Sequence, residues 1–113
     1  MDQIEKKAAV AAYRERKPAR GVFAVICSAT GEVWVDQSRN LDSQHNRLWF
    51  SLRHGNSFYK SLRSAWTAHG EDEFRFEELE RLRDDYPEIG IGDELKRRTA
   101  LWKQRLQAAS LAS

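Results

Sequence analysis

The hydrophobic positions of this chain change their spacing along its length, and the changes predict where strands and helices lie. In residues 21–27 apolar side chains fill both alternating sets of positions, which is typical of a strand covered on both faces. One set is Phe23, Val25 and Cys27, and the other is Val22, Ala24 and Ile26. A second apolar run follows the turn at residues 28–31. The two runs therefore predict a β-hairpin over residues 21–36.

Four other segments carry apolar residues at helical spacing. The first covers residues 2–16 and ends at Pro18. The second has Asn40 as its N-cap and runs to about Arg53, and the third begins at Asn56 or Ser57 and stops at residues 69–70. Asp93 is the predicted cap of the fourth. The inward positions are Leu41, Leu48 and Leu52, then Phe58, Leu62, Ala65 and Trp66, and last Leu95, Arg98, Trp102 and Leu106.

Residues 73–77 alternate with period two and predict a third, half-buried strand, while residues 83–92 carry the Gly, Pro and Asp of a loop. The order helix, strand, strand, helix, helix, strand, helix indicates an α+β fold. A chain of 113 residues suffices for one ordinary domain. We therefore expect residues 1–18 to form an appended N-terminal helix and residues 19–113 to form a single domain.

Charge is distributed unevenly along the chain although its net value is only +2. Residues 39–63 hold five basic groups and one acid, and residues 71–94 hold eleven carboxylates and three arginines. The basic segment could form a face that binds a polyanion, or simply be the solvated side of its helices.

The only cysteine, Cys27, lies inside the first apolar strand, so an internal disulfide is excluded. The first residues lack the pattern of a signal peptide, and no run of apolar residues is long enough to span a membrane. These features predict a cytoplasmic protein.

Two stretches of the sequence resemble the GIY-YIG nuclease family. The first reads GVF at residues 21–23, GEVWV at residues 31–35 and SRNL at residues 38–41. The second, residues 59–77, reads YKSLRSAWTAHGEDEFRFE and resembles the helix and strand in the middle of that family. The resemblance covers about residues 20–106. It implies a small three-stranded antiparallel sheet flanked by helices, in agreement with the element order.

The resemblance implies hydrolysis of DNA phosphodiester bonds, with Mg²⁺ or Mn²⁺ if the domain is active. Family members place two tyrosines in the opening motif, an arginine on the first helix and a glutamate on the late helix, which supply a base, a charge clamp and a metal ligand. This chain departs at each place. The corresponding positions are Phe23, Trp34, Gln44 and Thr99, and Asp36 stands where the family has glycine. Hydrolysis is therefore expected to be impaired or lost.

Other residues offer a rebuilt site, which is the alternative prediction of an active endonuclease. Arg47 lies three residues after Gln44 and so points to nearly the same side of the helix. His45 could act as a base, and Asp36 with Glu77 or Glu78 could bind a cation. The protein's metal ligands cannot be assigned from the sequence.

Nucleic acid, most simply DNA, is the expected partner. Phosphate contacts need only cations near the site, and the candidates are Arg39, Arg47, Arg53, Lys60 and Arg63. Trp49, Phe58 and Tyr59 lie among them and could stack on bases or belong to the core. A third alternative is a protein–protein interaction module that uses the acidic residues 71–94.

Overall fold

A computed structural model describes residues 18–57 and 59–110 of the chain, and the predicted hairpin lies at its centre. Strands β1 (Gly21–Cys27) and β2 (Val33–Ser38) pair antiparallel, with Val25 opposite Trp34. Gly31 in the connecting turn has a φ of +78°, a conformation that glycine adopts without strain. The hairpin is therefore confirmed. The predicted helix at residues 2–16 and the side chain of Phe58 fall outside the described residues.

The sheet has the strand order β3-β1-β2-β4, so β1 is paired on both edges. Strand β3 (Phe74–Arg81) is antiparallel to β1 and extends four residues beyond the predicted strand, because its pairing continues along β1 to Gly21. The α+β fold with three antiparallel strands is confirmed. Strand β4 (Ala109–Ser110) adds a two-residue parallel pairing to β2, which is too short to leave a pattern in the sequence.

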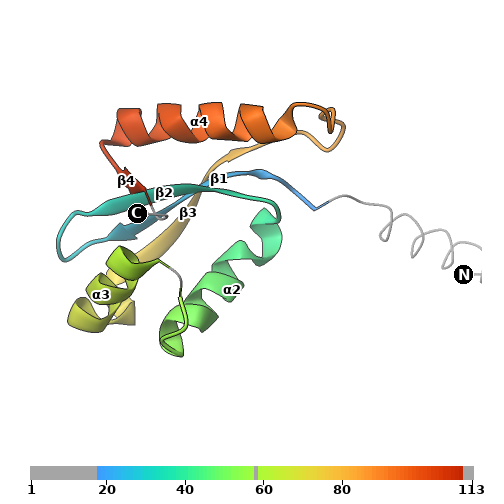
Figure 1. The fold of residues 1–113 in the computed structure, drawn as a ribbon. Helices are drawn as coiled ribbons and strands as arrows, with labels where there is room; N and C mark the ends of the chain where they lie inside the picture. The colour runs from blue at the N-terminus through green and yellow to red at the C-terminus, as the bar shows by residue number, and fades with distance from the viewer. Residues whose placement is uncertain (1–17, 58, 111–113) are drawn as a thin grey trace, which may run out of the picture.

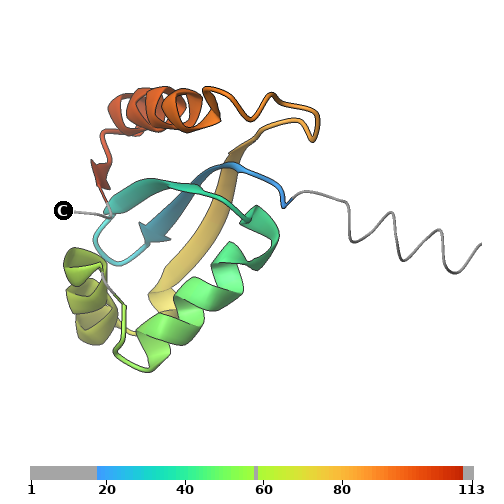
Figure 2. The same cartoon turned by 45° about the vertical axis from the view of Figure 1, so that its right-hand side comes forward.

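Helices cover both faces of this sheet (Figure 1). Helices α2 (Leu41–Arg53) and α3 (Lys60–His69) lie on one face, and α4 (Ile91–Leu106) crosses the other, as the turned view also shows (Figure 2). The larger core lies under α2 and α3. It contains Phe23, Val25, Cys27, Trp34, Leu41, Leu48, Trp49, Leu52, Leu62 and Trp66. A thinner core of Val22, Ala24 and Val35 lies under α4. Both faces of β1 are thus apolar, as predicted.

The helix ends match the sequence in part. Asn40 caps α2, since its side-chain oxygen accepts a hydrogen bond from the Ser43 backbone N–H at 3.4 Å. The predicted caps of α3 are wrong. This helix begins after Tyr59 without a side-chain cap, and the Ser57 hydroxyl instead accepts from the Tyr59 N–H at 3.2 Å, which forms a local turn before the helix.

The fourth helix also begins differently from the prediction. Its N-cap is Gly90, which turns the chain with a φ of +82°, and Asp93 lies in the first turn, where a negative charge is favourable. Leu95 is buried, but Leu106 is 37% exposed because it lies at the last residue of the helix, so that inward assignment is wrong. No helix in the described part of the chain is long and apolar enough to cross a membrane.

We expect Gly21→Ala to destabilise the fold by about 3 kcal/mol or more. A Cβ at this position would lie 1.9 Å from the Glu80 carbonyl oxygen, so β1 and β3 would have to separate. Urea unfolding followed by tryptophan fluorescence measures the loss. Gly92→Ala is the matched control, because its Cβ would meet nothing within 4 Å. Since Gly92 lies in α4, alanine there should raise the free energy of unfolding by about 0.5–1 kcal/mol. Equal stability of the two variants would contradict this packing.

Candidate functional site

Strand β2 presents three side chains to the α2 and α3 face of the sheet. Trp34, Asp36 and Ser38 alternate along the strand, so all three lie on this side. Phe23 on β1 is directly opposite Asp36. The two aromatic positions of the opening motif therefore lie close together beneath the helices.

Neither motif aromatic reaches solvent, since Phe23 and Trp34 are both 0% exposed. The Phe23 ring stacks on Phe76 of β3 with ring centroids 5.1 Å apart. The Trp34 indole N–H donates to the Ser61 hydroxyl at 3.2 Å, which ties β2 to the first turn of α3. Phe23 has no polar atom, and the single donor of Trp34 is already used. These positions therefore supply packing and no acid–base group.

An aromatic stack connects this core to the surface. The His45 ring lies parallel to Phe76 at 4.8 Å and meets the edge of Trp49 at 4.4 Å. Partial burial and, to a smaller extent, the charge of Arg53 lower the pKa of His45. Its neutral form is thereby favoured, and a neutral imidazole keeps one nitrogen as a proton acceptor.

Gln44 and Arg47 meet at the edge of the stack. The Ser38 hydroxyl donates to the Gln44 side-chain oxygen at 2.8 Å. Arg47 donates to the same oxygen at 3.4 Å, so its guanidinium reaches the Gln44 position from one helical turn later. The predicted convergence of these two side chains is therefore present.

Tyr59 is a site residue that the sequence identified only as a stacking candidate. It is half-buried at the start of α3. Burial, the Asp36 charge and a hydrogen bond with Asp36 raise the pKa of its hydroxyl, while Arg47 opposes the change. The phenol therefore stays protonated beside Asp36. Asp36 follows Trp34 by two residues, so strand alternation could have predicted that it lies on this face. Tyr59 is 23 residues further along the chain, and no local pattern predicts that it contacts Asp36.

The five predicted cations lie in different settings. Arg47 and Lys60 are exposed, and Lys60 forms no ion pair within the described residues. Arg53 makes two hydrogen bonds of 2.7 Å to Glu71 and therefore already has a carboxylate partner. Arg63 is half-buried and donates to the Ser57 carbonyl at 3.4 Å. Arg39 lies elsewhere, in a groove of about 440 Å³ beside the start of α4.

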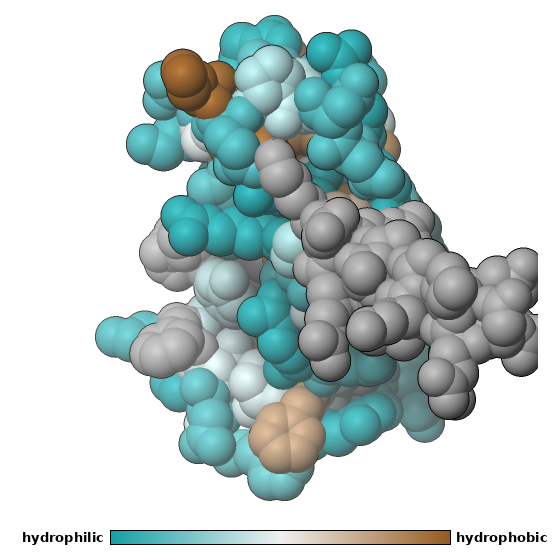
Figure 3. Space-filling view, turned by 90° about the vertical axis from the view of Figure 1, so that its right-hand side faces the viewer, coloured by the Kyte–Doolittle hydropathy of each residue, from teal (hydrophilic) through white to brown (hydrophobic). Residues whose placement is uncertain are grey.

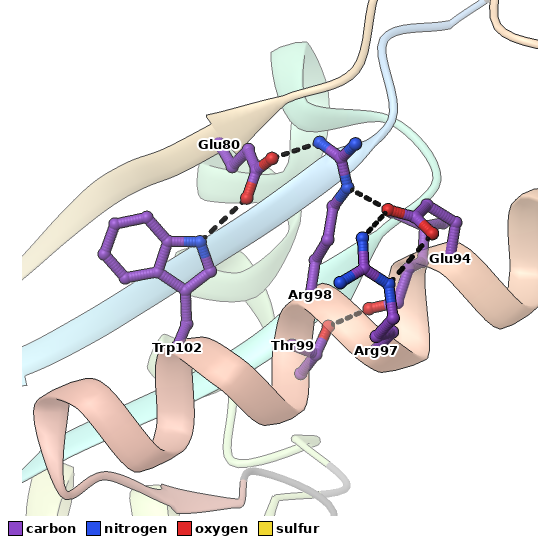
Figure 4. A network of polar contacts seen from close by, with 7 residues as sticks. Glu80, Glu94, Arg97, Arg98, Thr99 and Trp102 are labelled. Carbon is purple, nitrogen blue, oxygen red and sulfur yellow. Dashed lines mark hydrogen bonds and ion pairs between the residues drawn. The ribbon is translucent and has the colours of Figure 1, made fainter.

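The late helix offers no free metal ligand at the position that the resemblance indicates. Thr99 is buried, and its hydroxyl donates to the Leu95 carbonyl at 2.6 Å, one turn back in α4. Around it, a polar network holds α4 to β3 (Figure 4). The Trp102 indole donates to Glu80 at 2.9 Å, and Arg98 bridges Glu80 and Glu94.

Arginines also determine the protonation of Glu94 in this network. Hydrogen bonds from Arg97 and then Arg98 lower the pKa of Glu94 to about 2. The carboxylate thus stays charged and committed to this network at neutral pH.

The carboxylates proposed for a cation site are separated. Asp36 and Glu78 lie on β2 and β3, with Phe23 of β1 between them. Glu78 pairs with Arg81 at 2.7 Å, and Glu77 pairs with Arg75 at 3.0 Å. Across the described residues, no three His, Cys, Asp or Glu side chains converge. The described residues therefore offer no preformed cluster of protein ligands for Mg²⁺ or Mn²⁺, and the single carboxylate of the late helix that the resemblance implies is replaced by Thr99.

No family model and no curated protein matches the sequence. Solved structures do match the fold. The catalytic domain of the homing endonuclease I-TevI aligns with a TM-score of 0.68 at 18% identity, covering 83% of this chain and 99% of that chain. A point mutant of the same intron endonuclease domain aligns with a TM-score of 0.65 at 19% identity, covering 79% and 84%. The fold implied by the GIY-YIG resemblance is confirmed.

We expect the pKa of His45 to lie below the ordinary value of about 6.5 in an NMR titration of its ring protons. Arg53→Gln should raise this pKa only in part, because burial is the larger cause. Arg97→Gln on α4, across the sheet, is the control and should leave it unchanged. Because His45 is protonated at a higher pH in the unfolded chain than in the folded one, it lowers the free energy of unfolding as the pH falls below about 6.5. A His45 pKa above 6.5 would contradict the stacked arrangement.

Proposed function

We propose that this chain is a nuclease-like domain that binds DNA through α2 and α3 and hydrolyses it poorly or not at all. The observation that carries the proposal is the complete burial of Phe23 and Trp34, neither of which has a hydroxyl, next to exposed cations. A cytoplasmic location agrees with the buried free thiol of Cys27.

Loss of hydrolysis follows from what the site residues can donate or accept. The Trp34 N–H is bound to Ser61, Gln44 is neutral, and the Thr99 hydroxyl is bound within its helix. Removing a single positioned donor from an enzyme site typically lowers kcat by about 10²–10³-fold. Several absent groups in one constellation therefore favour a very low rate, even though their effects do not add.

DNA binding requires fewer chemical groups from this surface than DNA hydrolysis does. The fold resembles that of an endonuclease catalytic domain, and by this analogy we infer that one face of this chain meets the phosphate backbone of DNA. Arg47 and Lys60 present cations on neighbouring helices, and phosphate contacts need no base or metal. A protein–protein interaction module that uses the acidic residues 71–94 is less well supported than DNA binding, because many of these carboxylates already pair with arginines of this chain. These acids are Glu71, Glu77, Glu78, Glu80, Asp85, Glu88 and Glu94.

An active endonuclease with a rebuilt site is the second candidate. Its support is the contact of Arg47 with Gln44, which brings a guanidinium to the place of the family arginine. His45, whose neutral form is favoured, would be the available proton acceptor. A divalent cation would have to be bound largely by substrate phosphates, since the described residues offer no cluster of ligands.

We expect the protein to bind duplex DNA with an affinity that falls as salt rises, as measured by fluorescence anisotropy. Arg47→Ala and Lys60→Ala should each weaken binding and reduce the slope of log K against log salt by about 0.9, the value for one lost phosphate contact. Arg97→Ala is the matched control, because Arg97 is an exposed arginine on α4 that pairs with Glu94. Failure of the wild type to bind at low salt would reject DNA binding.

Supercoiled plasmid incubated with Mg²⁺ or Mn²⁺ should remain intact, because the site lacks the groups that activate water and hold the metal. Gel electrophoresis after prolonged incubation is the measurement. Cleavage that is abolished both by chelator and by Arg47→Ala would instead establish the rebuilt site. Cleavage that persists in Arg47→Ala would contradict the rebuilt site, and the same cleavage in a mock purification without the protein would identify a contaminating nuclease.

A further inference from the structure

The outer face of α2 carries a large apolar side chain in water. Phe50 is 61% exposed, while Leu48 and Leu52 on either side of it in sequence are 3% exposed. At 100° per residue, Phe50 points away from the core that these leucines enter. The residue therefore contributes little to the core. On the face drawn in Figure 3, the coloured residues are mostly hydrophilic and the apolar ones stand apart from one another.

The Phe50 ring is held in place by its neighbour one turn later. The rings of Phe50 and His54 stack with centroids 4.2 Å apart and an interplanar angle of 29°. His54 is itself fixed, because its Nδ1 lies 2.8 Å from the Phe50 carbonyl oxygen at the end of the helix. We call Phe50 and His54 together the Phe50 platform. An ordered ring with an open side can stack on a planar group at little cost in side-chain entropy.

Positive charge lies beside this platform. Arg47 precedes Phe50 by three residues, so their Cβ atoms are about 5–6 Å apart on the same side of the helix. The one acid of α2, Asp42, pairs with Arg81 of β3 at 2.9 Å. The charge of Arg53 is compensated by Glu71. Arg47 therefore gives the surroundings of Phe50 a net positive character, which complements a planar group that carries a phosphate.

We propose that the Phe50 platform stacks an unpaired base while Arg47 holds the adjacent phosphate, so that single-stranded DNA binds more tightly than duplex DNA. The inference rests on the proposed nucleic-acid binding and specifies the form of its ligand. In a duplex the bases stack on one another and expose their faces only at the ends, so Phe50 has no partner there. In a single strand each base offers a face to an exposed ring.

The test compares a fluorescein-labelled oligothymidine strand with a long duplex of mixed sequence, at one fixed low salt concentration. Phe50→Ala should weaken binding of the strand by about 5- to 150-fold and leave duplex binding nearly unchanged. Phe50→Trp should retain strand binding. Leu101→Ala is the matched control, because Leu101 is an apolar residue of α4 that is 47% exposed across the sheet. Circular dichroism checks that each variant is folded.

The outcomes separate the two proposals. Three results overturn the stacking role and leave DNA binding intact: a wild type that binds the strand no more tightly than the duplex, equal affinity of wild type and Phe50→Ala for the strand, and equal weakening for both nucleic acids. If the wild type binds neither the strand nor the duplex, both the proposed function and this inference are overturned. Selective loss of strand binding that Phe50→Trp restores supports the platform.

Discussion

Burial of strand β1 on all sides is the constraint on which the rest of the structure depends. The strand is paired with β2 and β3 along its edges and covered by helices on its faces. Gly21 lets β3 approach closely at one end, and Phe23 and Val25 fill the space beneath α2. A strand enclosed in this way has no position left for a polar side chain without a partner.

Because β1 is enclosed, the residues that can meet a ligand lie on elements other than this strand. Inward positions of β1 and β2 are committed to the core, so groups that can meet a ligand come from the helices above them. Arg47, Phe50 and Lys60 lie there on α2 and α3. On the opposite face, α4 is attached by a thinner apolar layer and by the charged contacts of Glu80 and Arg98. The two faces are therefore unequal, and the proposed ligand surface lies over the larger core.

The sequence predicted those parts of the fold that arise from local periodicity. The hairpin, the Asn40 cap and the inward leucines of α2 were all visible in the spacing of apolar residues. The start of α4 was not, because a glycine with a positive φ and an aspartate three residues later both resemble a cap. Strand β4 was missed because two residues carry no period.

The site was less predictable because its contacts join distant segments. Gln44 and Arg47 lie one turn apart, and their convergence followed from helical geometry alone. The bond from Trp34 to Ser61 spans 27 residues, and the pairing of Arg53 with Glu71 spans 18. Such contacts depend on how helices pack on the sheet, which no local pattern specifies. The cations that the sequence grouped together are accordingly divided among different partners.

The bond from Trp34 to Ser61 also bears on whether tyrosines could be installed at the two motif positions. A phenol at position 34 would leave the Ser61 hydroxyl without its donor and part of the indole volume empty. A phenol at position 23 would add an oxygen at the edge of a ring that is 0% exposed and stacked on Phe76, and a hydroxyl buried there without a hydrogen-bond partner would cost about 1–3 kcal/mol. Each exchange is thus opposed until neighbouring residues change with it.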